Sequence, residues 1–194
     1  GYALIIGPKD TLYENGCYFF SFHFNNNYPF QPPVVKFLTC DNITRFHPNL
    51  YRNGKVCLSL LNTWRGEQWT SCQTIRTILL NLVTLFHNKP LLNEPGIKED
   101  YRYFKDYNRI IKFSNYNTAV LSVLKDKIYK NVSDKFKDII IENYFKNKDK
   151  ILEHLKTLKN SEKKEIISIG IYSRMTCNID YNKLYNKFLE YNMQ

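Results

Sequence analysis

The sequence predicts an α+β fold, with an antiparallel β-meander in the first part of the chain and helices that back it. Two observations predict this class. Three short strand-like runs separated by turns open the chain, and from residue 75 onward apolar residues recur at helical spacing. The 194 residues are 43% hydrophobic and 15% aromatic, which suits a folded domain with a sizeable core.

The three expected strands follow one another closely. "YALIIGP" reads as a short strand that ends at Gly7-Pro8, and residues 17–24 ("CYFFSFHF") alternate, with aromatic side chains at 18, 20, 22 and 24 on one face. "NNNYPFQPP" is a rigid loop, because its prolines fix φ and remove backbone donors, and "VVKFLT" is the third strand. Short connections between sequential strands predict an antiparallel meander.

The helical part begins after residue 72. Apolar residues at 75, 78, 79, 82 and 86 predict an amphipathic helix, which "NKP" and "EPG" then interrupt. From residue 99 to the end we expect only helices. One long or broken helix spans about 103–128, further helices lie at 136–144 and 151–158, and a last one includes 184–188.

Charge and composition restrict the partners. The net charge is +10, but most of the basic excess lies after residue 96 and is interleaved with acids, as in "EKKE" and "NKDK". This pattern is typical of solvated helix faces, so we expect no nucleic-acid partner. A basic nucleic-acid-binding domain is the weaker alternative, and it predicts affinity that falls steeply with salt. No apolar run approaches 18 residues and no signal peptide is visible, so we expect no membrane partner.

The five cysteines are scattered and never spaced as Cys-x-x-Cys, and the four histidines form no cluster. The sequence therefore predicts neither a disulfide framework nor a metal site, and free thiols suit a cytoplasmic or nuclear location.

The segment "RFHPNLYRNGKVCLSLLNTW" is the candidate functional site. Cys57 follows a turn and enters an apolar run, so it is either an inert buried thiol or a nucleophile at the edge of a groove. The surrounding 40–72 segment is long for a structureless link, and such links are usually functional. The amide of Asn49 and the carboxylate of Glu94 are further groups that covalent acyl transfer could use.

An ordered set of motifs resembles the catalytic domain of ubiquitin-conjugating enzymes. It comprises "YPFQPPVVKFLT", "HPN", a cysteine eight residues after the Asn, Trp69 and a helix. "ALIIGPKDTLYENGC", "NLYRNGKVCLSLLNTWRG" and "LLNEPG" are similar to the large-enzyme branch that includes the BIR-repeat protein Apollon. The resemblance is strong over residues 3–96 and weaker to about residue 158.

The resemblance implies a role for each motif residue. Cys57 would carry ubiquitin or a ubiquitin-like protein as a thioester, and Asn49 would stabilise the oxyanion formed when a lysine amine attacks, directly or by holding the loop. His47 and Pro48 would support Asn49, and we interpret His47 as structural, because a lone His beside a turn usually closes a hydrogen bond. Glu94 would orient the amine and accept its proton, or would only cap a loop; both alternatives stay open.

The resemblance also implies partners: a ubiquitin-activating enzyme, a ubiquitin ligase and a protein substrate. Phe30 matches the loop aromatic presented to ligases, and we expect it to be exposed rather than in the core, because the flanking prolines leave few ways to bury it. Ser71 and Cys72 belong to the second ligase-facing loop. There "Thr-Ser-Cys" replaces the usual Ser-Pro-Ala, a departure that leaves ordinary RING-ligase pairing open. No cofactor is implied, since ATP is used by the activating enzyme.

We therefore expect residues 1–130 to form the conjugating domain and residues 131–194 a helical C-terminal extension packed on it. The first helix of the family has no counterpart before Gly1, and whether the chain is a fragment of a longer protein stays open. The alternative function is a non-catalytic module of the same fold that binds ubiquitin or a ligase, with Cys57 idle.

Overall fold

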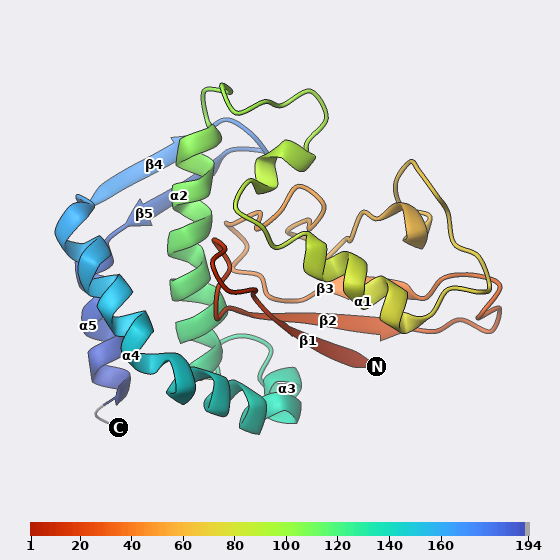
Figure 1. Cartoon of the computed structure of the whole chain (residues 1–194), viewed down its shortest axis with the longest axis horizontal. Coiled ribbons are helices and arrows are strands. Elements are labelled where there is room, and N and C mark those ends of the chain that lie inside the picture. The colour runs from red at the N-terminus through yellow and green to blue at the C-terminus, as the bar shows by residue number, and fades with distance from the viewer. Residues whose placement is uncertain (193–194) are drawn as a thin grey trace.

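The fold begins with a three-stranded antiparallel sheet in the order β1-β2-β3 (Figure 1). A computed structural model describes residues 1–192, with β1 at Tyr2–Ile6, β2 at Cys17–His23 and β3 at Val34–Phe37. Leu4 pairs with Phe19, and Phe20 pairs with Phe37. The predicted α+β class and meander are confirmed.

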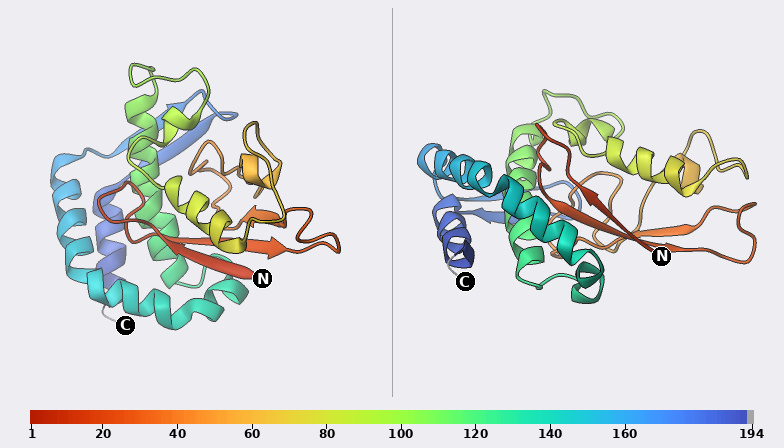
Figure 2. Two further views of the ribbon diagram at one scale, coloured as in Figure 1. Left: turned by 45° about the vertical axis from the view of Figure 1, so that its right-hand side comes forward. Right: turned by 60° about the horizontal axis from the view of Figure 1, so that its bottom comes forward.

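Helical segments account for most of the regular structure after the three strands, and two further views show how they lie around the sheet (Figure 2). In chain order they are η1 (Ser59–Leu61), α1 (Ile75–Thr84), η2 (Pro90–Asn93), α2 (Phe104–Ser114), η3 (Asn115–Ser122), α3 (Lys130–Ser133), η4 (Asp134–Phe136), α4 (Lys137–Ser161) and α5 (Tyr181–Asn192). The segment η3 is a π-helix that continues α2 directly, whereas η1, η2 and η4 are 3₁₀ turns.

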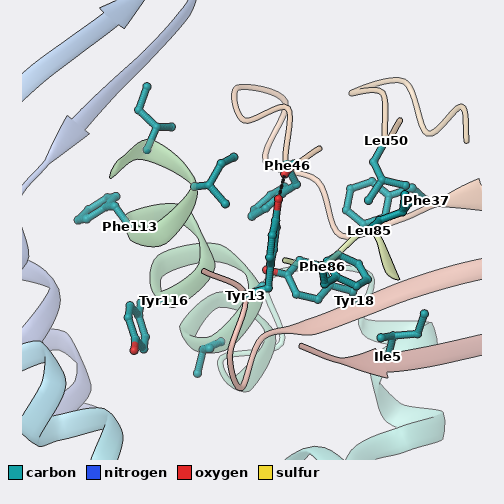
Figure 3. Close-up of a cluster of buried hydrophobic side chains, with 14 of the residues drawn as sticks. Ile5, Tyr13, Tyr18, Phe37, Phe46, Leu50, Leu85, Phe86, Phe113 and Tyr116 are labelled. Carbon is teal, nitrogen blue, oxygen red and sulfur yellow. Dashed lines mark hydrogen bonds between the residues drawn. The ribbon is translucent and has the colours of Figure 1, made fainter. Parts of the chain in front are cut away.

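The main core lies between the sheet, α1 and α2 (Figure 3). Helix α1 begins where predicted because Thr74 and Thr77 form a capping box, and it buries Ile78 and Leu82. The ring of Tyr18 stacks on that of Phe86 with centroids 4.4 Å apart. The aromatic face of β2 therefore forms the centre of the fold, as its alternation predicts.

The opposite face of β2 is also partly covered. Cys17 and Phe19 pack with Val123, Val132 and Ile140, which come from the end of η3 onward. This cover explains why β2 has apolar residues on both faces at its first half. Burial also raises the pKa of the Cys17 thiol to about 12, so this cysteine is an inert core residue.

Two buried tyrosines connect the core to the segment that precedes the "HPN" motif. The hydroxyl of Tyr13 donates to the carbonyl of Phe46 at 2.6 Å (Figure 3), and that of Tyr107 donates to the carbonyl of Arg45 at 2.8 Å. The backbone at 45–46 is thus fixed by groups from the loop after β1 and from α2.

The C-terminal part differs from the sequence expectation in two places. Residues 137–158 lie within one continuous helix, α4, because "FKNKDK" contains three lysines, which favour helix, and neither Gly nor Pro. Between α4 and α5 the chain forms a hairpin, β4 (Glu165–Ile169) and β5 (Met175–Ile179), where only helices were expected. The apolar face of this hairpin is buried, and its buried residues are Ile167, Ile169, Met175 and Ile179.

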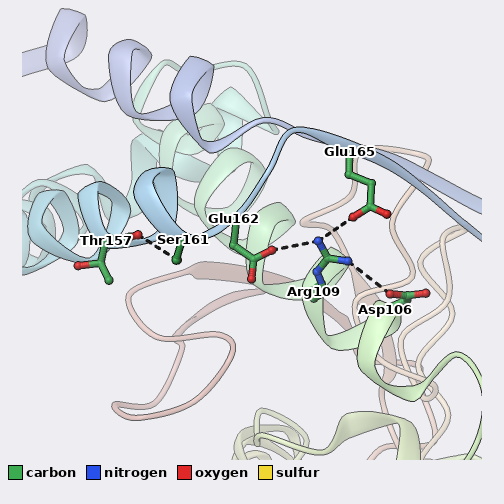
Figure 4. A network of polar contacts seen from close by, with 6 residues as sticks. All are labelled: Asp106, Arg109, Thr157, Ser161, Glu162 and Glu165. Carbon is green, nitrogen blue, oxygen red and sulfur yellow. Dashed lines mark hydrogen bonds and ion pairs between the residues drawn. The ribbon is translucent and has the colours of Figure 1, made fainter.

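An ion-pair network fastens this hairpin to α2 (Figure 4). The Arg109 guanidinium, on α2, lies 3.0 Å from the carboxylate of Glu162 and 2.9 Å from that of Glu165, and 3.5 Å from Asp106 one turn earlier. One cation therefore joins α2, the end of α4 and the start of β4.

Among residues 1–192, none of the helices combines the length and apolarity needed to cross a bilayer. The same residues contain no group of three or more His, Cys, Asp or Glu placed to hold a metal ion. The division of the chain at residue 130 stays a prediction.

Candidate active site

Cys57 lies in an extended segment that is paired with the "HPN" turn. Its backbone N–H donates to the carbonyl of Asn49 at 2.9 Å, and the side-chain amide of Asn49 donates to the carbonyl of Cys57 at 2.6 Å. The two residues predicted to act together are therefore brought together. Cys57 itself is only 2% exposed, so its thiol lies beneath the surface.

His47 is enclosed and closes the turn. Its Nδ1 accepts the backbone N–H of Asn49 at 3.0 Å, which leaves the ring proton on Nε2, for which the described residues offer no partner. Burial lowers the pKa of His47 well below its usual value, with smaller contributions from His87 and Arg45. A neutral ring that accepts a backbone N–H is a support for Asn49 and cannot serve as a cationic group.

Arg45 supports the same turn from below. Its guanidinium donates to the carbonyl of His47 at 3.4 Å and to the carbonyl of Pro48, which is buried. It lies between two aromatic rings, 3.5 Å from the ring centroid of Tyr51 and 4.3 Å from that of Tyr172. A cationic side chain, itself packed against two aromatic rings, thus binds the carbonyls of the turn.

The segment after Cys57 folds back and borders a cavity of about 660 Å³. The Thr63 hydroxyl accepts the N–H of Leu58 at 2.9 Å and donates to the carbonyl of Val56 at 2.8 Å, so it clamps the backbone on both sides of the cysteine. The lining residues are Asn62, Thr63, Trp64, Arg65, Gln68 and Pro95. The segment after Cys57 (residues 62–68) and Pro95, the residue after Glu94, therefore line the same cavity.

Glu94 ends the short helix η2, and its side chain is held by the hairpin. The Tyr172 hydroxyl donates to Oε2 of Glu94 at 2.6 Å. Among the described residues this carboxylate accepts no backbone N–H, so the loop-capping alternative does not describe its contacts. His87 links η2 back to the turn: its ring lies 6.1 Å from that of His47, and its Nε2 bonds Asn93 at 2.9 Å.

The two expected partner loops lie next to each other. Phe30 is 81% exposed, which excludes the core alternative, and Ser71 and Cys72 are exposed as well. The indole N–H of Trp69 donates to the carbonyl of Pro29 at 2.7 Å and so connects the two loops.

Sequence reasoning missed three residues at this site. Thr63 and Arg45 lie within the quoted segment, and only their hydrogen bonds, which a sequence does not show, distinguish them. Tyr172 comes from a hairpin 78 residues after Glu94. No local pattern connects residues so far apart.

In chemical terms the site offers a thiol, a side-chain amide, turn N–H groups and a carboxylate around one backbone framework. Groups of these types can serve as a nucleophile, as oxyanion donors and as a proton acceptor in acyl transfer. Within the described residues, no side chain that could act as a base forms a hydrogen bond or an ion pair with the Cys57 thiol.

Several known proteins are similar to this chain in sequence. The zebrafish (Danio rerio) protein named Ubiquitin-conjugating enzyme E2 Z is 42% identical over 130 residues, which are 66% of this chain and 40% of that protein. The human protein of the same name is 43% identical over 129 residues, 65% of this chain and 36% of that protein. The human Dual E2 ubiquitin-conjugating enzyme/E3 ubiquitin-protein ligase BIRC6 is 34% identical over 162 residues, 77% of this chain and 3% of that protein.

The chain thus spans two fifths or less of the length of these relatives. They include the large-enzyme branch that the sequence motifs predicted. The family model described as Ubiquitin-conjugating enzyme matches residues 2–116, more than half of the chain, and this protein therefore belongs to the ubiquitin-conjugating enzyme family.

Proposed function

We propose that this chain carries ubiquitin, or a ubiquitin-like protein, as a thioester on Cys57 and transfers it to a lysine amine. The observation that carries the proposal is the reciprocal bonding of Cys57 and Asn49, which holds the side-chain amide of Asn49 against the backbone of the residue that bears the thiol. Family membership supports the reaction class.

Two acyl transfers follow. The sulfur of Cys57 attacks the thioester carbonyl on the activating enzyme, whose thiol leaves. A lysine amine then attacks the new thioester, and Asn49 and turn N–H groups stabilise the resulting oxyanion. Collapse forms the amide and expels the Cys57 thiolate, while the amine proton passes to Glu94 or to solvent. The chain needs no cofactor of its own, because the activating enzyme uses the ATP.

The partners we propose are a ubiquitin-activating enzyme, a ligase and a protein substrate. The exposed side chains of Phe30, Ser71 and Cys72 supply one continuous surface for a ligase, since Trp69 joins the loops that bear them.

The test is charging of the full-length natural chain with a panel of ubiquitin-like proteins, their activating enzymes and ATP. Cys57→Ala should abolish the reductant-sensitive conjugate, and Cys57→Ser should accumulate an ester that a thiol reductant does not cleave. Cys177→Ala is the matched control, because this half-buried thiol lies in β5. Normal charging of Cys57→Ala would refute the assignment.

One observation favours a second candidate, a non-catalytic module that binds ubiquitin or a ligase. The thiol of Cys57 is almost closed from solvent, and an idle cysteine needs no access. This candidate predicts ubiquitin or ligase binding that Cys57→Ala leaves unchanged, with no conjugate formed by the unmodified chain.

A further inference from the structure

The turn of the C-terminal hairpin has an unusual backbone. Between β4 and β5, three consecutive residues with side chains adopt left-handed conformations: Tyr172 at φ 58°, Ser173 at φ 57° and Arg174 at φ 59°. Such conformations are uncommon for residues other than glycine, and they persist where the surroundings hold them. The contacts of Tyr172 show what holds this turn.

Tyr172 reaches the candidate site through both parts of its side chain. Its hydroxyl donates to Oε2 of Glu94 at 2.6 Å. Its ring packs edge-on against Tyr107, with centroids 6.1 Å apart, and stacks under the guanidinium of Arg45. Burial raises the pKa of Tyr172, and Tyr107 and Glu94 raise it further, so the hydroxyl keeps its proton and remains a donor.

A second residue of the hairpin, Met175, contacts the backbone of Arg45. Its sulfur accepts the backbone N–H of Arg45 at 3.2 Å. Since the Arg45 side chain in turn donates to the carbonyls of His47 and Pro48, the hairpin supports the turn that holds Asn49. The C-terminal hairpin therefore contacts the site at two places, the turn and Glu94.

The bond to Glu94 leaves one carboxylate oxygen available. Among the described residues Oε2 accepts from Tyr172, and Oε1 has no hydrogen-bond donor. The next residue, Pro95, lines the cavity that residues of the 62–68 segment also line. A carboxylate fixed through one oxygen presents the other in a defined direction, which is the requirement for orienting an amine.

We propose that Tyr172 is a positioning residue for the transfer reaction, whose hydroxyl fixes the Glu94 carboxylate toward the incoming lysine amine. This inference rests on the proposed function, in which Cys57 carries the modifier and Glu94 orients the amine. It assigns to the C-terminal hairpin a part in catalysis that the family's motif residues do not include.

The direct test is Tyr172→Phe in the full-length natural chain, charged with ubiquitin and then chased with free lysine. Because the ring is kept, the stack with Arg45 stays and only the hydroxyl is lost. Charging should be unchanged. The maximal discharge rate should fall about ten- to hundredfold, the range that a hydrogen bond to a charged group carries. The half-saturating lysine concentration should not change, because the lost interaction acts in the transition state.

A double-mutant cycle separates positioning from general damage. In a Glu94→Gln background, Tyr172→Phe should slow discharge no further, because the group it positions is already gone. Discharge onto hydroxylamine, a small neutral amine, should change little. Tyr185→Phe is the matched control: this half-buried tyrosine on α5 donates no hydrogen bond from its hydroxyl within residues 1–192.

A further pair of variants tests the hydrogen bond to Glu94 without the aromatic ring. Tyr172→Gln retains a hydrogen-bond donor, and it should discharge lysine faster than Tyr172→Leu, which has none. Equal rates for these two, or wild-type discharge by Tyr172→Phe, or equal losses in the presence and absence of Glu94, would overturn the inference while leaving Cys57 charging intact. Failure of the unmodified chain to charge would instead overturn the proposed function and the inference with it.

Discussion

Asn49 directs its side-chain amide at the backbone of Cys57 and not into open solvent, and its Oδ1 is buried without a partner among the described residues. The amide is therefore held against the backbone of the residue whose sulfur would carry the thioester. Removing one oxyanion donor typically costs 10²–10³ in rate, about 2.7–4 kcal/mol.

We predict that Asn49→Ala slows transfer to lysine by about this factor and slows charging less, because charging also uses the activating enzyme's own site. Single-turnover measurements of the two half-reactions test it. Asn49→Asp keeps the size of the side chain but faces the Cys57 carbonyl with an acceptor, so it should lose transfer as well. Equal losses in both half-reactions would mean that Asn49 only holds the loop.

His47 makes the stability of the fold depend on pH. Burial lowers the pKa of this ring in the folded state, so between its folded and unfolded pKa values the unfolded chain binds more protons. Its contribution is therefore complete above about pH 6.5 and is lost as the pH falls. Burial and Lys112 also lower the pKa of His154, so His154 changes the stability with pH in the same direction.

We predict that the free energy of unfolding decreases between pH 7 and pH 5, by up to about 1.4 kcal/mol per pH unit for each such ring. His47→Gln should remove its part of this slope. Chemical denaturation at several pH values measures both. Groups that titrate in both proteins cancel in the difference, so an identical slope in His47→Gln and wild type would contradict the prediction.

At the scale of elements, the helix α4 shows how the C-terminal part contributes to the main core. Leu155 is fully buried, and it joins the same cluster as Tyr18 on β2 and Leu184 on α5. Replacing a buried Leu by Ala typically costs 2–5 kcal/mol, because a cavity remains.

We predict that Leu155→Ala lowers the melting temperature by roughly 5–20 °C, at 2–4 °C per kcal/mol for a chain of this size. The neighbouring Lys156→Ala, on the exposed side of α4, is the control and should change it little. If both variants melt alike, α4 does not stabilise the protein through this contact.

The elements also show why some could be predicted and others could not. The strands β1 to β3 and helix α1 follow from local periodicity, since each directs regularly spaced apolar residues into the main core. The hairpin β4-β5 was missed because its residues follow a long helical region and its turn, "GIYSR", has none of the usual hairpin dipeptides. Its position depends on ion pairs from α2 to Glu162 and Glu165, which lie far away in sequence.

At the scale of the whole molecule, the site residues also fall into those that the sequence could predict and those that it could not. Cys57, Asn49 and His47 lie within eleven residues, so motif and spacing bring them together. The groups that support them come from the whole length of the chain. Tyr13 near the start and Tyr107 on α2 donate to the backbone at 45–46, and the ring of Tyr172 near the end packs against the guanidinium of Arg45. One hydrophobic cluster includes side chains from β1 to α5, which is why such distant groups can meet at one turn.

The placement of the two tryptophans has an optical consequence. Trp69 is packed with its indole N–H bonded to Pro29, whereas Trp64 is 44% exposed beside the cavity after Cys57. Indole emission moves to shorter wavelength when water is excluded from the ring. The protein thus contains a constant internal fluorophore and a solvent-sensitive one at the cavity, and filling that cavity would be visible as a blue shift without any attached dye.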